Sequence, residues 1–460
     1  MGSRHGDAAA PGNPGPYPSL AQRLDRMPNG APEHPALERI LRLLFSPEEA
    51  ALAAALPTLV RVDRLARRRG TDRASLDAQL DDMAARGLVL DLRHNDVRWV
   101  ALAPVVIGFY EFTFMRVRED TPAAELAGLF DDYLFTDPHQ RFIEAVFAGS
   151  VQLGRTLVAE EALPGPASET LDFQRASRII ADAEHIAVAA CPCRTHAALL
   201  GQGCDAPVRT CMSFGSAAEA LVRAGLAEPV DTAEALTLLA DAKAAGLAQT
   251  ADNVAGGVAY LCNCCGCCCG MMRAIRTRGV GGAIVPSDWV AAGDLHACRG
   301  CASGCVPACP TGAIVREQSD RHGARRYRAR VEEDRCLGCG VCVDACRFGV
   351  RTLQRRATQP FTPASGLDRM IAMAIERGKL GALIIDTLAG VGPSGLARLL
   401  GHLEASPPGP ARRAVAPLRS VFLRGVLKLL HARGRRARDH APASGPGGVA
   451  PPAGAPGGLR

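Results

Sequence analysis

Two cysteine runs constrain the fold of this chain more than any other feature of its sequence. The first run, CRGCASGCVPACP, begins at Cys298, and the second, CLGCGVCVDAC, begins at Cys336. Together they contain eight cysteines: Cys298, Cys301, Cys305, Cys309, Cys336, Cys339, Cys342 and Cys346. A tight loop with C-x2-C-x2-C spacing turns three thiolates toward one cubane iron–sulfur cluster, and a fourth thiolate comes from elsewhere in the chain. The two runs therefore predict a compact module built around two clusters that exchange their fourth ligands.

These residues resemble the bacterial two-[4Fe-4S] ferredoxin fold, and the second run matches the spacing of that fold throughout. The resemblance implies that each cluster takes three cysteines from one run and the last cysteine of the other. The implied ligand sets are Cys298, Cys301, Cys305 and Cys346 for one cluster, and Cys309, Cys336, Cys339 and Cys342 for the other.

The first run departs from the ferredoxin pattern by one extra residue, which makes its spacing C-x2-C-x3-C. The loop must therefore bulge near Ser303 and Gly304, and glycine makes such a bulge feasible. The second run is followed by Arg347, where the pattern has proline. These departures leave open whether the first cluster keeps all four irons. A zinc ribbon is a competing interpretation of the paired C-x2-C units, although it leaves the third and fourth cysteines of each run without a role.

A second cysteine-rich region precedes this module. The stretch LCNCCGCCCG contains six cysteines: Cys262, Cys264, Cys265, Cys267, Cys268 and Cys269. Four more lie upstream, at Cys191, Cys193, Cys204 and Cys211. On either a helix or a strand the six would divide into two sets of three on opposite faces, and we expect Cys191 and Cys193 to share one face of an apolar strand. We predict one or two further iron–sulfur centres here; zinc in the upstream four and inert buried thiols are the alternatives.

The interpretation of the cysteines depends on the compartment. The chain has 18 cysteines, and its first 35 residues contain no apolar core of the kind that a secretory peptide needs. The longest apolar stretches are too short to span a bilayer. We therefore expect a cytoplasmic protein, in which thiols stay reduced and dense cysteine spacing indicates metal or redox chemistry rather than disulfides.

Residues 36–110 predict three helices followed by a β-hairpin, an order that resembles a winged helix-turn-helix. Thr71 is the expected N-cap of the third helix and Gly87 its expected end. Four aspartates on that helix would be repelled by phosphate: Asp72, Asp77, Asp81 and Asp82. DNA binding is therefore an alternative, and docking of a protein partner is favoured.

The sequence predicts an α+β multidomain protein with a winged-helix-like N-terminal domain, a Cys-rich α/β region, a dicluster ferredoxin-like module and a helical C-terminus. The expected divisions are a disordered leader, the winged-helix-like domain, a helical and then Cys-rich α/β region, the two-cluster module, a helical region and a disordered tail, at residues 1–35, 36–110, 111–290, 291–357, 358–440 and 441–460. Residues 411–440 carry nine basic residues and one acidic residue, more than the whole net charge of +6. A basic amphipathic helix near 417–438 could rest on an anionic membrane or an acidic partner, or pack on its own protein.

The order of the motifs CPCR, CDAPVRTC and CNCCGCCCG ahead of the two-cluster run, after a winged-helix-like start that ends in VVIGFYEF, is similar to a family of uncharacterised ferredoxin-type iron–sulfur proteins of bacteria. That likeness implies electron transfer to or from a partner oxidoreductase, and it names no substrate. We therefore expect an electron carrier or oxidoreductase subunit rather than a stand-alone enzyme, and we predict no catalytic residue. The alternatives are a redox-sensing winged-helix regulator and an enzyme that acts on a small molecule at residues 262–269.

Overall fold

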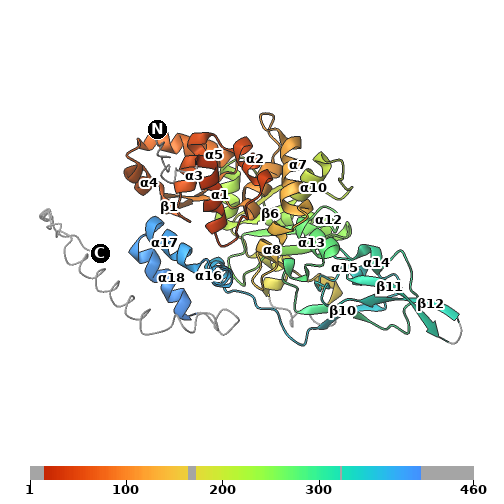
Figure 1. Ribbon diagram of the computed structural model, residues 1–460. Coiled ribbons are helices and arrows are strands. Elements are labelled where there is room, and N and C mark those ends of the chain that lie inside the picture. Colours follow the sequence, from red (N-terminus) through yellow and green to blue (C-terminus); the bar gives the residue numbers. More distant parts are fainter. Residues whose placement is uncertain (1–14, 164–171, 322–323, 406–460) are drawn as a thin grey trace, which may run out of the picture.

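The computed structural model describes residues 15–163, 172–321 and 324–405. A helical N-terminal domain packs on a central sheet, and a small β-rich module projects from the other side of that sheet (Figure 1). The helices that follow this module return to the N-terminal domain. One hydrophobic core runs from Leu20 through the central region to Cys269 and Leu337.

The N-terminal domain contains the helices and the β-hairpin expected from the sequence, with two additional elements, helix α3 and strand β1, the second of which makes the sheet three-stranded. Its elements are α2 (Pro35–Leu44), α3 (Pro47–Ala55), β1 (Val60–Arg61), α4 (Val62–Arg69), α5 (Arg73–Ala85), β2 (Val89–His94) and β3 (Val97–Leu102). The sheet has the strand order β1-β3-β2. The N-cap of α5 is Asp72 rather than Thr71, because the Asp72 carboxylate accepts a hydrogen bond from the Ser75 N–H at 2.9 Å. Gly87 follows this helix with a φ of 72°.

The expectation of a disordered leader over residues 1–35 is wrong for its second half. Residues 16–26 form α1 (Pro16–Arg26), and residues 1–14 lie outside the described residues. Tyr17, Leu20 and Leu24 fall on one helical face and are buried. Pro16 and Pro18 stand in the first turn of the helix, where a missing N–H costs no hydrogen bond.

The middle of the chain contains helices and then a six-stranded sheet. The helical part comprises η1 (Val105–Phe109), α6 (Tyr110–Met115), α7 (Ala123–Asp131), η2 (Asp132–Thr136) and α8 (Arg141–Phe147). The strands are β4 (Gly154–Thr156), β5 (Ile186–Ala190), β6 (Arg209–Phe214), β7 (Glu228–Val230), β8 (Ala248–Asp252) and β9 (Tyr260–Cys264), in the order β4-β8-β9-β6-β5-β7.

Every neighbouring pair of strands in this sheet is antiparallel. The expected Cys-rich α/β region is therefore a mixture of helices and strands whose sheet is antiparallel. Its helices are α9 (Ala176–Ala181), α10 (Pro192–Leu199), α11 (Gly215–Arg223), α12 (Thr232–Ala244) and α13 (Gly270–Arg278). Helix α12 is capped as expected, since the Asp231 carboxylate accepts a hydrogen bond from the Glu234 N–H at 2.8 Å.

The projecting module consists of two antiparallel strand pairs and two short helices. Its elements are β10 (Trp289–Gly293), α14 (Cys305–Ala308), β11 (Ile314–Arg321), β12 (Ala324–Val331), α15 (Val341–Asp344) and β13 (Arg351–Arg355). Strand β10 pairs with β13, and β11 pairs with β12. Helix α14 lies within the first cysteine run and α15 within the second, and the two helices contact each other.

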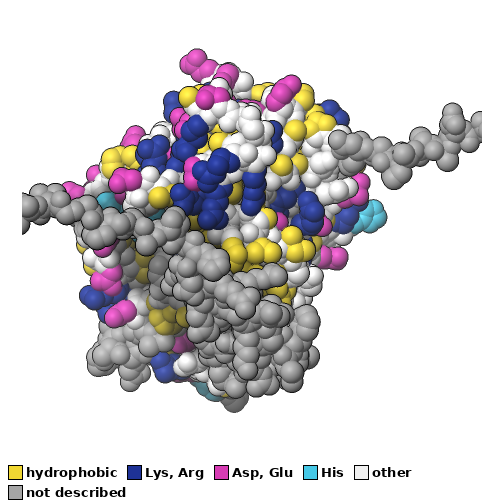
Figure 2. Space-filling view, turned by 90° about the vertical axis from the view of Figure 1, so that its left-hand side faces the viewer, with side chains coloured by type: hydrophobic (Ala, Val, Ile, Leu, Met, Phe, Trp, Pro, Cys, Tyr) yellow, Lys and Arg dark blue, Asp and Glu magenta, His cyan; other side chains and the backbone are white. Residues whose placement is uncertain are grey.

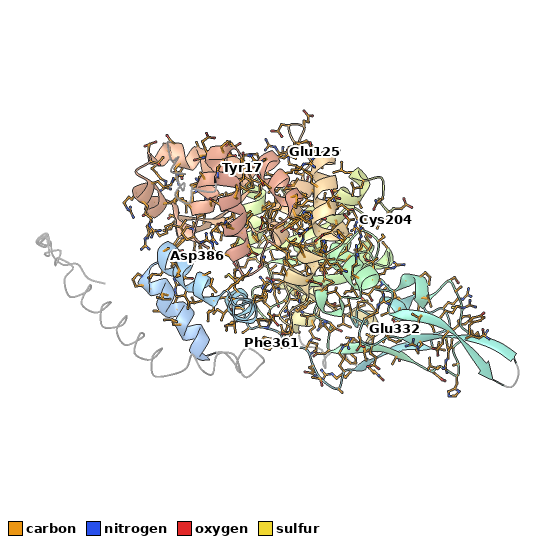
Figure 3. All side chains as sticks on the ribbon, viewed as in Figure 1. Tyr17, Glu125, Cys204, Glu332, Phe361 and Asp386 are labelled. Carbon is orange, nitrogen blue, oxygen red and sulfur yellow. The ribbon has the colours of Figure 1, made fainter. Side chains whose placement is uncertain are left out.

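Three helices follow: α16 (Gly366–Glu376), α17 (Leu380–Gly390) and α18 (Pro393–Ala405). They lie beside α1, where Asp386 of α17 forms an ion pair with Arg23 at 2.8 Å (Figure 3). Val391 and Gly392, within the glycine-rich stretch GVGPSG, separate α17 from α18. No helix among the described residues is long and apolar enough to cross a bilayer. The basic helix expected near 417–438 and the disordered tail expected at 441–460 lie outside the described residues.

Candidate metal centres

Cysteines of the two runs lie near one another in the projecting module, in two groups that each combine both runs. In the first group, burial and then the thiol of Cys309 raise the pKa of Cys339 to about 12. Burial raises the pKa of Cys342 as well, and the thiols of Cys339, Cys336 and Cys309 act in the same direction. The four members line one small apolar cavity with Ala291 and Ile314: Cys309, Cys336, Cys339 and Cys342. The last cysteine of the first run therefore lies among the first three of the second run.

The second group has the reciprocal composition. Burial raises the pKa of Cys305, and the thiols of Cys346 and Cys298 act in the same direction. Gly304, where the sequence predicted a bulge, precedes α14 and faces Cys301: a methyl group on Gly304 would lie 3.2 Å from the Cys301 sulfur. Glycine at this position lets the extra residue of the loop fit without displacing that sulfur.

Polar groups surround the sulfur atoms of both groups. Backbone N–H groups donate to sulfur from Ala313 to Cys309 at 3.2 Å, from Ala291 to Cys336 at 3.4 Å and from Ala329 to Cys298 at 3.4 Å. The guanidinium of the buried Arg351 lies 3.9 Å from the Cys305 sulfur. Hydrogen bonds and positive charge at sulfur stabilise thiolates and raise the reduction potential of a cluster that they hold. Both groups thus have the number of donors and the polar surroundings of a four-thiolate cluster site.

The ten upstream cysteines divide into six and four, not into the expected sets of three. The backbone is strand in β9 up to Cys264, then a turn, then an N-cap at Cys269. Residues two apart on a strand share a face, so Cys262 and Cys264 point the same way. The turn carries the next three cysteines away from the sheet, and the chain returns at Cys269. The division therefore follows from a change of backbone conformation within the motif.

Cys191 and Cys193 do not share the face of a strand, as the sequence suggested. Strand β5 ends at Ala190, Cys191 is the N-cap of α10, and Cys193 stands in the first turn of that helix. Pro192 stands at the first helical position, where it favours a helix start. Both thiols nevertheless face the cysteines of β6 and β9.

A group of six thiols, which we call the six-thiol group, results from this arrangement. Each thiol has a neighbour within hydrogen-bonding reach, in the order Cys191, Cys193, Cys269, Cys264, Cys262 and Cys211. All six line a cavity of about 340 Å³. Apolar side chains form much of the remaining wall, and Leu90 and Leu92 of β2 belong to it. The N-terminal domain therefore contributes to the enclosure of the six-thiol group.

The polar side chains of this cavity wall are held in place. Arg194 donates to the Thr210 hydroxyl at 2.6 Å and to the Asn263 carbonyl oxygen at 3.1 Å.

The cavity wall also contains an unusual backbone conformation beside Glu111. Ile107 has a left-handed backbone with a φ of 52°, which is rare for a β-branched residue. The Glu111 carboxylate accepts a hydrogen bond from the next N–H, that of Gly108, at 3.1 Å. Burial nevertheless raises the pKa of Glu111 to about 7.

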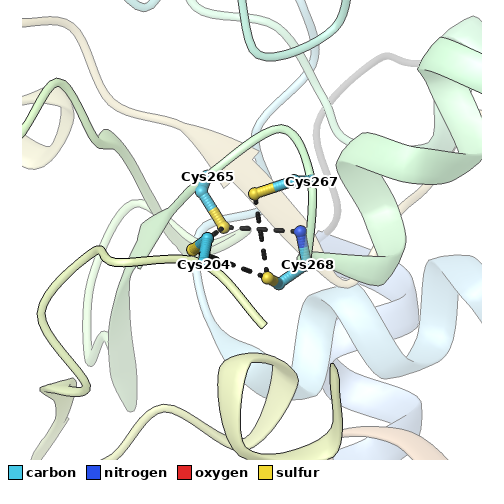
Figure 4. Close-up of side chains that lie close together, drawn as sticks. All are labelled: Cys204, Cys265, Cys267 and Cys268. Carbon is cyan, nitrogen blue, oxygen red and sulfur yellow. Dashed lines mark hydrogen bonds between the residues drawn. The ribbon is translucent and has the colours of Figure 1, made fainter. Parts of the chain in front are cut away.

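The other four cysteines form a separate, tighter group, which we call the four-thiol group: Cys204, Cys265, Cys267 and Cys268 (Figure 4). Their sulfur atoms all lie within 4.8 Å of one another. The alternative that placed zinc among Cys191, Cys193, Cys204 and Cys211 is therefore wrong in its membership, because Cys204 lies with the turn after β9. Burial opposes ionisation of Cys265, but the Cys268 N–H, the Cys267 thiol and the Arg194 guanidinium lower its pKa to about 6.

The histidines near these cysteines have structural roles. The buried His196 places Nε2 2.9 Å from the carbonyl oxygen of Ala127 and Nδ1 3.3 Å from the Tyr110 hydroxyl. His185 lies 3.3 Å from a carboxylate oxygen of Glu219. The ring nitrogens named here thus contact a backbone carbonyl, a hydroxyl and a carboxylate rather than a cysteine.

The cysteine-rich region and the projecting module are in direct contact. The turn at Gly266 packs on the backbone of Pro310, next to Cys309. On the other side, the Ala159 N–H donates to the carbonyl oxygen of Cys339 at 2.9 Å. Two backbone contacts thus join the cysteine loops of the module to the central region.

Comparison with known proteins agrees with this geometry. Residues 297–350 match the family model of the 4Fe-4S dicluster domain. This chain is therefore an iron–sulfur protein of the ferredoxin type over that segment. Over 57 residues it is 44% identical to the thiosulfate reductase electron transfer subunit PhsB of Salmonella typhi. The match covers 12% of this chain and 26% of that relative. No solved structure matches the chain.

Proposed function

We propose that the protein transfers single electrons to or from a partner oxidoreductase through two [4Fe-4S] clusters in the dicluster domain. The ligands would be Cys298, Cys301, Cys305 and Cys346 for one cluster, and Cys309, Cys336, Cys339 and Cys342 for the other. The clusters supply the one-electron chemistry, and the protein supplies thiolates, N–H donors and an apolar enclosure.

The observation that carries this proposal is the exchange of the fourth cysteine between the two runs. Cys309 lies with the second run, and Cys346 lies with Cys298 and Cys305 of the first. This exchange keeps two four-thiolate sites within one small domain, as a protein that passes electrons between clusters requires. A zinc ribbon does not explain it, because each such site would need only two C-x2-C pairs.

We extend this proposal to the six-thiol group, which has more thiolates than one cubane needs. Its six sulfur atoms line one cavity, and the turn between two of its members packs on Pro310 beside Cys309. A further iron–sulfur cluster at this position would place a third redox centre next to the dicluster domain. The cavity beside it has apolar walls that could admit a small molecule.

The partner is proposed from the relative. The matched protein is named as the electron transfer subunit of a thiosulfate reductase, and the matched segment is a quarter of its length. We infer for this chain a partner of the same general kind, an oxidoreductase whose identity the match does not specify. We also propose a reducing compartment such as the cytosol, where this many cysteines stay free to bind metal.

The test is the content of iron and acid-labile sulfide per chain after anaerobic purification. We expect about twelve of each, since three four-iron clusters would be present. The double variant Cys262→Ser, Cys264→Ser should contain about eight and should still be reduced reversibly by a low-potential donor. A wild-type protein with about eight irons, unchanged in the variant, would limit the proposal to the dicluster domain. Absence of sulfide or of reversible reduction would reject the electron-transfer function itself.

One observation favours a second candidate, a redox-sensing regulator with a winged-helix-like DNA-binding domain. Leu90 and Leu92 of the β2–β3 hairpin line the cavity of the six-thiol group, so a change there would reach the N-terminal domain. Basic side chains gather on the side of the molecule where α4 lies, and Arg67, Arg68 and Arg69 are exposed there (Figure 2).

Helix α5 argues for the electron-transfer function instead. Its Asp77 and Asp81 bind the guanidinium of Arg98 at 2.8 and 2.6 Å, and its exposed face is acidic. A salt-dependent shift of duplex DNA that changes with cluster oxidation would establish the regulator. Intact clusters without any such shift would exclude it.

A further inference from the structure

The four-thiol group is more compact than the other cysteine groups of the protein. The sulfur atoms are separated by 3.9 Å between Cys204 and Cys265, 3.6 Å between Cys204 and Cys268 and 3.7 Å between Cys267 and Cys268. Each of the four sulfur atoms lies within 4.8 Å of the other three. Figure 4 shows them converging on one point between the turn after β9 and the loop that carries Cys204.

These separations identify the kind of centre that fits. Zinc–thiolate bonds are about 2.3 Å long, so the sulfur atoms of a tetrahedral site lie about 3.8 Å apart. The four thiolates of a cubane each bind a different iron and lie farther apart than this. The four-thiol group therefore matches a single tetrahedral ion, and a [4Fe-4S] cluster would require the turn and the Cys204 loop to separate.

We infer that Cys204, Cys265, Cys267 and Cys268 bind one zinc ion. Four protein thiolates close the coordination sphere, as in structural zinc sites. The Cys268 N–H lies 3.4 Å from the Cys265 sulfur, and the Arg194 guanidinium lies 3.9 Å from the same atom. These groups offset the negative charge that four thiolates bring to a divalent ion.

The position of the ion gives it a structural role. Three of its ligands lie in the turn between β9 and α13, and the fourth lies between α10 and β6. The ion would hold this turn against the Cys204 loop. Two members of the six-thiol group flank the turn in the sequence: Cys264 precedes it and Cys269 follows it. The same turn presents Gly266 to Pro310. Zinc suits this role because it ties the segments together without a redox change.

The inference does not depend on the proposed electron transfer, and one set of measurements separates the two. Zinc, iron and acid-labile sulfide are measured in the full-length protein purified anaerobically, beside the single variants Cys267→Ser and Cys204→Ser. We expect about one zinc per chain in the wild type, a loss of most of it in both variants, and unchanged iron and sulfide. The matched control is Cys211→Ser, in the six-thiol group, which should keep its zinc.

Several results would overturn the inference. Zinc that stays bound in both variants would place it elsewhere, and a loss of about one iron without sulfide would identify a mononuclear iron site. A loss of about four irons with sulfide would make the group part of a cluster. Zinc-edge X-ray absorption of the wild type tests the site even if the variants do not fold: four sulfur ligands at about 2.3 Å are expected. Zinc with nitrogen or oxygen ligands, or no zinc, would reject the assignment.

Discussion

Gly266 lies so close to Pro310 that a methyl group on Gly266 would stand 2.4 Å from the Pro310 carbonyl oxygen and 2.8 Å from its Cα. The contact joins the turn of the four-thiol group to the residue that follows Cys309. Both partners are backbone, so neither can move aside as a flexible side chain would. The spacing between the cysteine-rich region and the dicluster domain therefore depends on the absence of a side chain at residue 266.

Replacing Gly266 by alanine should separate these two regions. We expect Gly266→Ala to lower the free energy of unfolding by about 1 to 3 kcal/mol, the usual range for overpacking in a tight contact. Electron exchange between the six-thiol centre and the dicluster domain should slow, which rapid-mixing absorption spectroscopy can follow. The control is Gly128→Ala in α7, where an added methyl group meets nothing within 4 Å and alanine favours the helix. Equal stability of the two variants would contradict the prediction.

The charge of Arg351 should raise the potential of the cluster that we propose for Cys298, Cys301, Cys305 and Cys346. Arg351 is buried, so its charge is weakly screened, and its guanidinium lies 3.9 Å from the Cys305 sulfur. Two unit charges about 4 Å apart interact by about 4 kcal/mol at an effective dielectric constant of about 20, which corresponds to a shift on the order of 0.2 V. We expect Arg351→Met to lower one potential by this amount in a redox titration.

Two further variants test whether charge is the cause of that shift. Arg351→Lys keeps the charge and should restore most of the potential. Arg347→Met removes an exposed charge near the same group, where solvent and salt screen it, and should shift the potential much less. A shift as large in Arg347→Met as in Arg351→Met would argue against the buried contact.

Glu111 should make the stability depend on pH. Burial raises its pKa to about 7, above the 4.5 of an ordinary glutamate, so the folded protein holds a proton that the unfolded chain has lost. The Glu111 carboxyl therefore adds most to the free energy of unfolding below pH 4.5. Its contribution falls by up to about 1.4 kcal/mol per pH unit as the pH rises toward 7. In thermal unfolding between pH 6 and 8, Glu111→Gln should remove the part of the decline near pH 6 to 7. Identical pH profiles for the two proteins would refute this assignment.

Leu20 tests whether the first described helix belongs to the core. The side chain is fully buried on α1 and contacts the N-terminal helices. We expect Leu20→Ala to cost about 2 to 5 kcal/mol in the free energy of unfolding, the range for a buried leucine. Replacement of the exposed Glu48 by alanine provides the comparison and should change stability by less than about 1 kcal/mol. A neutral Leu20→Ala variant would restore the expectation of a dispensable leader.

The dicluster domain could be predicted from the sequence because its ligands lie within short loops of characteristic spacing. The spacing also predicts a bulge near Gly304, since one extra residue between two ligands has few places to go. The grouping of the other ten cysteines could not be predicted in this way. It depends on where β9 ends, at Cys264, and on which loop meets the turn, and neither is a local property. Sequence position suggested that Cys204 belongs with Cys211, whereas the fold places it with Cys265.

The N-terminal helix could not be predicted either, although its apolar residues lie close together in the sequence. The composition of residues 1–35 favours disorder, because prolines and glycines surround the apolar residues Tyr17, Leu20 and Leu24. Three buried side chains on an 11-residue helix are a weak signal alone, because an isolated helix of this length is barely stable in water. Its stability comes from packing on α2 and α3, which the local sequence does not reveal.

The contacts between α1 and the helices that follow the dicluster domain also bear on the order of assembly. The Arg377 guanidinium donates to the carbonyl oxygens of Pro28 and Asn29 at 2.9 and 2.8 Å, and Asp386 binds Arg23. During synthesis every cysteine is incorporated before residues 366–390, since the last is Cys346. The contacts that join these late helices to residues 23–29 can therefore form only after the whole cysteine-bearing part of the chain has been made.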